Sequence, residues 1–348
     1  MLESLCRMFP DADVFTHVVD RDAISKDIAS HTIKTTFISR LPAPRRMYQA
    51  YLPFMPMALE QLDLTGYDLV ISSESGPAKG IVPGPSAVHL CYCHSPMRYI
   101  WDHYHLYRSQ AGLFKRLFMA VIFHYLRIWD QTSSLRTDKY LANSRFVAKR
   151  IKKYYNRDST ILYPPVAVHE FAPVDADELG DYYLWAGQLV RYKRPDIAIE
   201  AFCRTGQKLV VIGDGEERKA LEKISGDNIT FLGNAPFCDL KHHFARCKAL
   251  IFPGEEDFGI VPVEVQAAGR PVIAFGKGGV LDTVIDGRTG ILFPDCSVDG
   301  LVAAIEKFES SGLAQNCTAD CVANAARFSE DKFQAGVRLA LAELGINA

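Results

Sequence analysis

The sequence predicts an α/β protein with two domains, each built around a parallel sheet. Short apolar, β-branched runs alternate with helix-length amphipathic segments along most of the 348 residues. This alternation is typical of parallel sheets whose strands are connected by helices. The length supports two domains, because a chain of this size generally exceeds one ordinary core.

The strands are expected where β-branched and aromatic residues gather. In the first half they are DVFTHVV, YDLVISS, SAVHLCYCH, DKYLAN and STILYP, and in the second half YYLWAG, KLVVIG, NITFLG, ALIFP, PVIAF and GILFP. Most strands of the second half end at Gly or Pro, where a strand commonly gives way to a loop. This order predicts two Rossmann-like domains that face a cleft. Ligands of such sheets bind beyond the carboxyl ends of the strands, so the site is expected in those loops.

The domain boundary is expected after the strand that ends at Tyr-Pro-Pro, where an acidic stretch without clear period begins. We expect residues 1–165 to form an N-terminal domain and residues 166–180 to be a linker. A second, C-terminal domain would follow over 181–328. The remaining residues, 329–348, would form a helix that returns to the N-terminal domain.

The composition, 48% hydrophobic and 23% charged, is that of a globular protein. Residues 1–170 carry 21 Lys and Arg against 15 Asp and Glu, or +6, whereas residues 171–348 carry 18 against 26, or −8. A basic first half suits an anionic ligand or an anionic membrane surface, and a solvated basic face is the alternative. No nucleic-acid partner is expected.

Nothing in the sequence predicts a membrane-spanning helix or a secretion signal, so a cytoplasmic location is expected. The segment 112–129 is predicted to be a buried connecting helix, with docking on the inner face of the membrane as the alternative. The nine cysteines are expected to be reduced. The spacing of Cys91 with Cys93, and of Cys317 with Cys321, allows a metal pair, but buried thiols are the favoured interpretation.

The most informative segment is IFPGEEDFGIVPVEVQAAGRPVIAF, residues 251–275. A strand is expected to end at Pro253, followed by an acidic loop and a helix that begins near Gly259 and ends near Gly269. A helix N-terminus offers unpaired N–H groups and a partial positive charge, which favour a phosphate. The backbone of Gly259 and Ile260 would supply them.

Two glutamates flank the start of that helix. Glu256 lies in the loop before it and Glu264 in its second turn, so one can face a sugar ring while the other reaches a ribose. A carboxylate can accept hydrogen bonds from both hydroxyls of a diol. A surface acidic loop with a favourable charge at a helix start is the alternative.

With its Glu-x7-Glu spacing in EDFGIVPVEVQAAGRPVIA, the sequence resembles glycosyltransferase family 4, closest to bacterial polysaccharide mannosyltransferases. Other matching segments occur in the same order: YCHSPMRYIWD, LANSRFVAKRIKKYY, LYPPV, AGQLVRYKRPDIAIEAF, VIGDGEERKALE and GGVLDTVIDGRTGILF. The resemblance covers nearly the whole chain. It implies the GT-B architecture, with residues 1–165 as the acceptor-side domain and 181–328 as the nucleotide-sugar-binding domain, and retention of anomeric configuration.

The resemblance also implies roles for individual residues. Catalytic roles fall on His94, Lys193 and Glu256, with Lys193 stabilising the departing diphosphate. Donor-binding roles fall on Gln188, Arg191, Gly213, Gly215, Gly259, Ile260, Glu264 and Gly279. The family often has arginine where this chain has Gln188, and Arg191 or Arg194 would compensate. For Arg194 a solvated helix start is favoured.

Family members usually begin with a strand and a glycine-rich loop, whereas this chain begins inside what resembles the following helix. The N-terminal domain is therefore expected to lack its first strand, and a late start codon is the favoured explanation. The implied reaction moves a hexose, mannose from GDP-mannose, to a lipid-linked oligosaccharide or polysaccharide acceptor. It would need no metal or other cofactor.

Three alternatives remain open from the sequence. One is a transferase that uses a UDP-sugar, and another is a metal-dependent transferase with an Asp-x-Asp site. The third is a non-catalytic subunit that binds or senses sugar nucleotides, which the substitution at Gln188 and the absent loop would favour.

Overall fold

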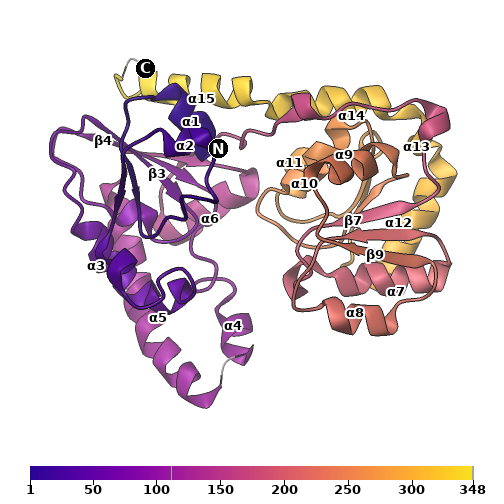
Figure 1. Cartoon of the computed structure of the whole chain (residues 1–348), viewed down its shortest axis with the longest axis horizontal. Coiled ribbons are helices and arrows are strands. Elements are labelled where there is room, and N and C mark those ends of the chain that lie inside the picture. The colour runs from indigo at the N-terminus through magenta and orange to yellow at the C-terminus, as the bar shows by residue number, and fades with distance from the viewer. Residues whose placement is uncertain (111, 347–348) are drawn as a thin grey trace. The chain divides into compact units, whose positions relative to one another are not determined.

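The computed structural model describes residues 1–110 and 112–346 and divides into two compact units (Figure 1). Unit 1 comprises Met1–Tyr163 and Gln334–Ala348, and unit 2 comprises Pro164–Phe333. The last helix, α15 (Glu330–Ala342), begins in unit 2 and continues into unit 1. The chain therefore ends in the unit in which it began.

Unit 2 contains a six-stranded, fully parallel sheet in the order β12-β11-β10-β7-β8-β9. Its strands are β7 (Tyr183–Ala186), β8 (Leu209–Ile212), β9 (Ile229–Gly233), β10 (Leu250–Phe252), β11 (Val272–Phe275) and β12 (Gly290–Phe293). The strand order reverses between β7 and β10, which are neighbours in space. This is the doubly wound arrangement, and its ligand site lies at the reversal.

The helices of unit 2 lie between these strands and after the last of them. They are α7 (Pro195–Thr205), α8 (Arg218–Ile224), α9 (Phe237–Arg246), α10 (Ile260–Ala267), α11 (Val280–Thr283), α12 (Val298–Ser311), α13 (Leu313–Asn316) and α14 (Thr318–Ala325). One continuous apolar core joins β7 and β8 to α7 and α12, and every residue of β7 and β10 is buried. Strands covered on both faces must be apolar throughout, which explains runs such as LVVI and LIF.

Unit 1 contains two separate parallel sheets. Strands β1 (Val14–Thr16) and β2 (Ile33–Thr35) form one, and β3 (Leu69–Glu74), β4 (Val88–Cys93), β5 (Lys139–Ala142) and β6 (Ser159–Ile161) form the other, in chain order. Its helices, besides the end of α15, are α1 (Leu2–Met8), α2 (Lys26–Ala29), α3 (Met55–Glu60), α4 (Tyr104–Gln110), α5 (Leu113–Ser133) and α6 (Arg145–Tyr155). Within the described residues the first element is α1, as the sequence predicts. The apolar core of this unit is divided among several small clusters.

The structure confirms a strand within each of the predicted runs, and helices begin at Pro195 and directly after Gly259 as expected. The sequence did not predict β2, because Ile33–Thr35 is short, half exposed and contains a lysine. After Gly213 and Gly215 the next helix begins only at Arg218, since the intervening turn is hydrogen-bonded to the loop after β7.

The buried-thiol interpretation is confirmed for both cysteine pairs. Cys91 and Cys93 are fully buried, and burial raises the pKa of each thiol well above its ordinary value. Cys317 and Cys321 are also buried. All four side chains pack in apolar clusters.

Candidate functional site

The loops after β7 and β10 meet at the point where the strand order of unit 2 reverses. Lys193 ends a short 3-10 helix, Arg191–Lys193, after β7, and Glu256 lies in the loop between β10 and α10. Lys193 Nζ lies 2.8 Å from Glu256 Oε1, and each side chain is about one-fifth exposed. The structure thus brings together two of the residues predicted to be catalytic.

A glycine allows this close approach. A Cβ atom added at Gly254 would lie 2.7 Å from the Cα atom of Lys193, closer than packed atoms tolerate. The loop after β10 can therefore lie against the backbone of Lys193 only because residue 254 has no side chain. This contact sets the position of the lysine beside Glu256.

The loop after β11 holds the backbone of Glu256 from the other side. Gly279 N–H donates to the Glu256 carbonyl oxygen at 2.8 Å, and Gly278 forms a parallel bridge with the same residue. A Cβ atom at Gly279 would lie 2.3 Å from Phe258 Cα. Gly279 is therefore required for the close packing of the loops after β10 and β11. This requirement is independent of any contact between its backbone and a ligand.

Helix α10 begins immediately after the loop that follows β10 and contains Glu256. Gly259, with φ +84°, occupies the N-cap position and cannot cap the helix with a side chain, and Ile260 begins the first turn. First-turn N–H groups of a helix attract anions when no side chain caps them. Glu264 lies one turn further on and is half buried, and burial raises the pKa of its carboxyl group to about 7.

Two other predicted donor-binding glycines lie in the loop after β8. Gly213, with φ +130°, approaches the loop after β7 so closely that a Cβ atom would lie 1.8 Å from the Gly187 carbonyl oxygen. Gly215 makes a similar approach to Leu189. Gly213 N–H donates to Gly233, and Gly215 N–H donates to the Asp214 side chain. These glycines therefore pack the loops together and use their amides within the protein.

The polar side chains of the loop after β7 differ in their partners. Gln188 is exposed, and Arg191 is mostly exposed with Nε 3.7 Å from Glu217. Arg194 adopts a left-handed backbone conformation and binds both carboxylate oxygens of Asp196. That pairing occupies the Arg194 guanidinium group, so Arg191 is the arginine of this loop more open to a ligand.

His94 directly follows β4 in unit 1, as predicted. Its Nε2 lies 3.1 Å from Ser73 Oγ, its backbone N–H donates to the Glu74 carbonyl oxygen at 2.7 Å, and its ring meets the edge of Tyr92. Burial lowers the pKa of the imidazole to about 4. His94 is therefore neutral near pH 7 and can donate or accept a hydrogen bond, but it supplies no positive charge.

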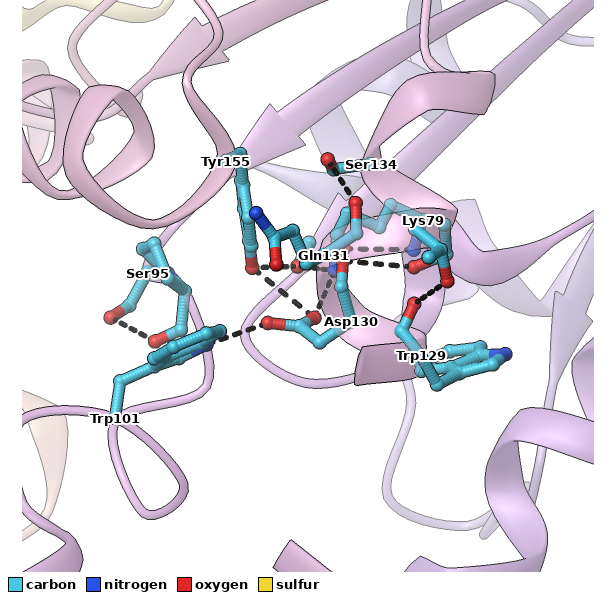
Figure 2. A network of polar contacts seen from close by, with 12 residues as sticks. Lys79, Ser95, Trp101, Trp129, Asp130, Gln131, Ser134 and Tyr155 are labelled. Atoms are coloured by element: carbon cyan, nitrogen blue, oxygen red, sulfur yellow. Dashed lines mark hydrogen bonds and ion pairs between the residues drawn. The ribbon is translucent and has the colours of Figure 1, made fainter. Parts of the chain in front are cut away.

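A buried charged cluster includes Glu74, whose backbone carbonyl oxygen accepts the hydrogen bond from His94, and sequence reasoning missed this cluster. Lys79 Nζ lies 3.0 Å from Glu74 Oε1 and also pairs with Asp130, and all three side chains are fully buried. Figure 2 shows Lys79 and Asp130 at its centre, with the Tyr155 hydroxyl beside them. The available signal was Glu74 at the end of a predicted strand, where doubly wound sheets often carry functional groups.

The titration of this cluster is unusual because it holds two carboxylates and one ammonium. Burial raises the pKa of Glu74 to about 7, with the charge of Asp130 contributing. Burial alone would lower the pKa of Lys79, but Glu74 and Asp130 raise it above its ordinary value. A proton on one carboxylate would leave the cluster neutral, which is the favourable state inside a protein.

The same cluster holds the segment after His94. Trp101 Nε1 donates to Asp130 Oδ2 at 2.7 Å, and the Trp101 ring stacks on Tyr154 with centroids 4.7 Å apart. Tyr99 packs against the apolar cluster around Phe123. Both aromatic side chains therefore have packing roles.

Part of the chain is similar in sequence to known glycosyltransferases. Residues 170–328 match the family model described as glycosyl transferases group 1. An uncharacterised glycosyltransferase of Methanocaldococcus jannaschii is 27% identical over 224 residues, which is 63% of each chain. The alpha-1,3/1,6-mannosyltransferase of Homo sapiens is 28% identical over 261 residues, 63% of this chain and 58% of that one. The matches thus span less than two thirds of these relatives.

Solved structures extend the similarity to the fold of the whole chain. HepE of Anabaena in complex with UDP superposes with a TM-score of 0.70 at 15% identity, covering 98% of this chain and 95% of that one. Such low identity supports a shared fold and nothing more. The chain has the GT-B fold, and its residues 170–328 are similar to group 1 glycosyl transferases.

Proposed function

We propose that the chain is a retaining hexosyltransferase that moves mannose from GDP-mannose to a lipid-linked oligosaccharide or polysaccharide. The observation that carries the proposal is the contact between Lys193 and Glu256 at the strand-order reversal of unit 2. The match of residues 170–328 to group 1 glycosyl transferases supports the reaction class.

The Lys193–Glu256 pair is suited to exchange partners when a donor binds. Both side chains keep about one-fifth of their surface exposed, so a ligand that enters this loop region can reach them. A diphosphate offers Lys193 more negative charge than one carboxylate does, and phosphate oxygens at the start of α10 would gain first-turn N–H groups. Glu256 would then be free to accept hydrogen bonds from the hydroxyls of the sugar.

In the proposed reaction the bond between C1 of the sugar and the diphosphate oxygen breaks. The acceptor hydroxyl oxygen forms the new bond to C1 on the same face, and its proton passes to the departing phosphate. Lys193 and the N-terminus of α10 at Gly259 stabilise the charge that develops on the leaving group. No metal ion and no covalent intermediate on the protein is required. The neutral His94 would contribute a hydrogen bond only.

The choice of donor rests on the relatives. The human relative is named a mannosyltransferase, which supports mannose and hence GDP-mannose. HepE is known in complex with UDP, so a UDP-sugar is the alternative donor. For these substrates we propose that the reaction occurs in the cytoplasm, at the inner face of the plasma membrane.

A donor panel tests the proposal. The thermal midpoint of unfolding is measured with GDP-mannose, UDP-glucose, UDP-galactose and dTDP-glucose, and release of free nucleotide is followed with and without a chelator. We expect GDP-mannose to raise the midpoint most and to be hydrolysed slowly even in chelator. If only a UDP-sugar raises the midpoint, the donor is that UDP-sugar and not GDP-mannose. Binding without hydrolysis or transfer would instead favour the non-catalytic subunit, and a loss of activity in chelator would overturn the metal-independent mechanism.

A further inference from the structure

Helix α5 exposes an apolar face on the side away from the core of unit 1. Leu117 is 72% exposed and Tyr125 66%. At about 100° per residue, the exposed apolar positions lie within one narrow stripe of the helix. The stripe consists of Leu117, Phe118, Val121, Tyr125 and Ile128.

The opposite face of the same helix is buried. Phe123 and Leu126 pack against Met97 and Ile100 in one apolar cluster. The prediction of a buried helix is therefore right for this face and wrong for the stripe. The apolar side chains are spread around the helix because one set builds the core and a second set faces outward. In Figure 1 the N-terminal half of α5 projects beyond β3 and β4 of its own unit.

The surroundings of the stripe are cationic. Residues 103–129 contain four Lys and Arg and no Asp or Glu. His105, Arg108, Ser109 and Arg116 line a hollow of about 270 Å³ where α4 and α5 meet. Arg116 donates to the carbonyl oxygens of Arg108 and Ser109, at 3.1 and 2.9 Å, which holds the two arginines together.

The exposed apolar stripe and the cations around it together indicate the chemistry of the partner that binds this surface. An exposed apolar patch of this kind marks an interaction surface. A second copy of the chain is disfavoured, because a two-fold interface would place the same cationic segment against itself without a carboxylate to pair with it. A bilayer with anionic headgroups complements both parts, since apolar side chains enter the interface and arginines meet phosphates.

We propose that the outward stripe of α5 and the arginine-lined hollow beside it dock unit 1 on an anionic lipid surface. None of the helices within residues 1–110 and 112–346 has the length and apolar character required to cross a bilayer. Docking of this kind needs neither a spanning helix nor sugar transfer. It therefore stands or falls independently of the proposed function.

The test is co-sedimentation of the full chain with phosphatidylglycerol vesicles and, separately, with phosphatidylcholine vesicles. The first variant, Leu117→Ser with Phe118→Ser, removes apolar side chains without changing charge. The second, Arg108→Gln with Arg116→Gln, removes two cations. The matched control is Leu339→Ser on α15, because Leu339 is also a largely exposed leucine, at 63%, in the same unit.

The parent and the control should bind phosphatidylglycerol and bind phosphatidylcholine much more weakly. We expect each arginine removed to weaken partitioning about fivefold and the serine variant to weaken it at least about tenfold. All variants should keep the parent's circular dichroism and melting midpoint, because the changed side chains are exposed.

Parent-like binding by both test variants, or equal binding of the parent to the two lipids, would overturn the proposal. Analytical ultracentrifugation without lipid addresses the rival occupant. A stable dimer that the serine variant disrupts would identify the stripe as a self-association surface and would equally overturn lipid docking.

Discussion

Lys193 Nζ and Glu256 Oε1 lie 2.8 Å apart although they belong to loops that follow different strands of unit 2. The contact arises because β7 and β10 are neighbours at the reversal of strand order. Sites of doubly wound sheets lie at this position for the same topological reason. The pair is therefore the natural first target for mutation.

Lys193→Ala should lower the rate of sugar transfer or donor hydrolysis about 100- to 1,000-fold, because it removes a cation from the departing diphosphate. The thermal midpoint is measured in parallel, because both side chains are only about one-fifth exposed and the loss of the pair also acts on folding. Steady-state rates and melting curves of the purified protein measure both effects.

Lys277→Ala is the matched control for Lys193→Ala. Lys277 pairs with Glu255 at 2.9 Å in the loops after β11 and β10, and it is 60% exposed. This variant should retain nearly full activity. Equal losses in the two lysine variants would show that general loop charge, and not Lys193 itself, supports the reaction.

Gly213→Ala should destabilise unit 2 by at least about 2 kcal/mol, because the new methyl group would meet the Gly187 carbonyl oxygen and the backbone has positive φ. Gly206→Ala separates the two causes, because Gly206 also has positive φ but nothing lies within 4 Å of its added Cβ. Urea unfolding of both variants, followed by circular dichroism, gives the comparison. Similar free energies of unfolding would mean that the close packing of the loops costs little to relax.

Glu264→Gln should stabilise the protein at neutral pH and not at low pH. Burial raises the folded-state pKa of Glu264 from 4.5 to about 7, so the folded state binds the extra proton between these values. Stability is then lost as pH rises through this window, by up to about 3 kcal/mol, and glutamine removes the loss.

The check on Glu264 is the difference in free energy of unfolding between variant and parent, measured by urea titration at several pH values. The difference should be near its maximum above pH 7.5 and should disappear below pH 4.5. Glu74 titrates in the same window in both proteins and cancels in the comparison. A difference independent of pH would contradict the raised pKa.

His94 should remain neutral from about pH 5.5 upward, because burial lowers its pKa to about 4. A proton–nitrogen NMR titration, with the resonance assigned from a His94→Asn variant, measures this directly. An inflection near pH 6.5 would show that the ring is more solvated than its position beside Ser73 and Tyr92 indicates.

Lys79→Met should destabilise unit 1 by about 3–5 kcal/mol, because Glu74 and Asp130 would be left buried without their cation. Lys152→Met is the control, since its pair with Asp158 is exposed and contributes at most about 1 kcal/mol. Chemical denaturation measures both. If adding Asp130→Asn to Lys79→Met does not recover stability, uncompensated charge is not the cause of the loss.

Much of the fold was predictable because its signals are local. The strands β7, β8 and β10 appear in the sequence as unbroken apolar runs, and Pro195 marks the start of α7 where proline is favoured. By contrast β2 was missed, because three half-exposed residues carry no period that distinguishes a strand from a loop.

The candidate site was predictable residue by residue, but not as an arrangement. Resemblance assigned Lys193 and Glu256 separately, whereas their contact depends on strand order, which periodicity does not encode. Glu74, Lys79 and Asp130 read as ordinary surface charges in the sequence. Their burial depends on how η3 (Ala78–Gly80) and α5 close over the end of β3.

The sequence by itself determined the order and type of the elements and the chemical character of each loop, because these follow from neighbouring residues. Only the tertiary structure decided which loops contact each other, which charged side chains are buried and which apolar face of α5 is exposed to solvent. Those outcomes depend on contacts between residues distant in the chain. Lys193 and Glu256 illustrate both contributions. The sequence supplied a lysine and a glutamate, and the strand order of the sheet brought them into contact.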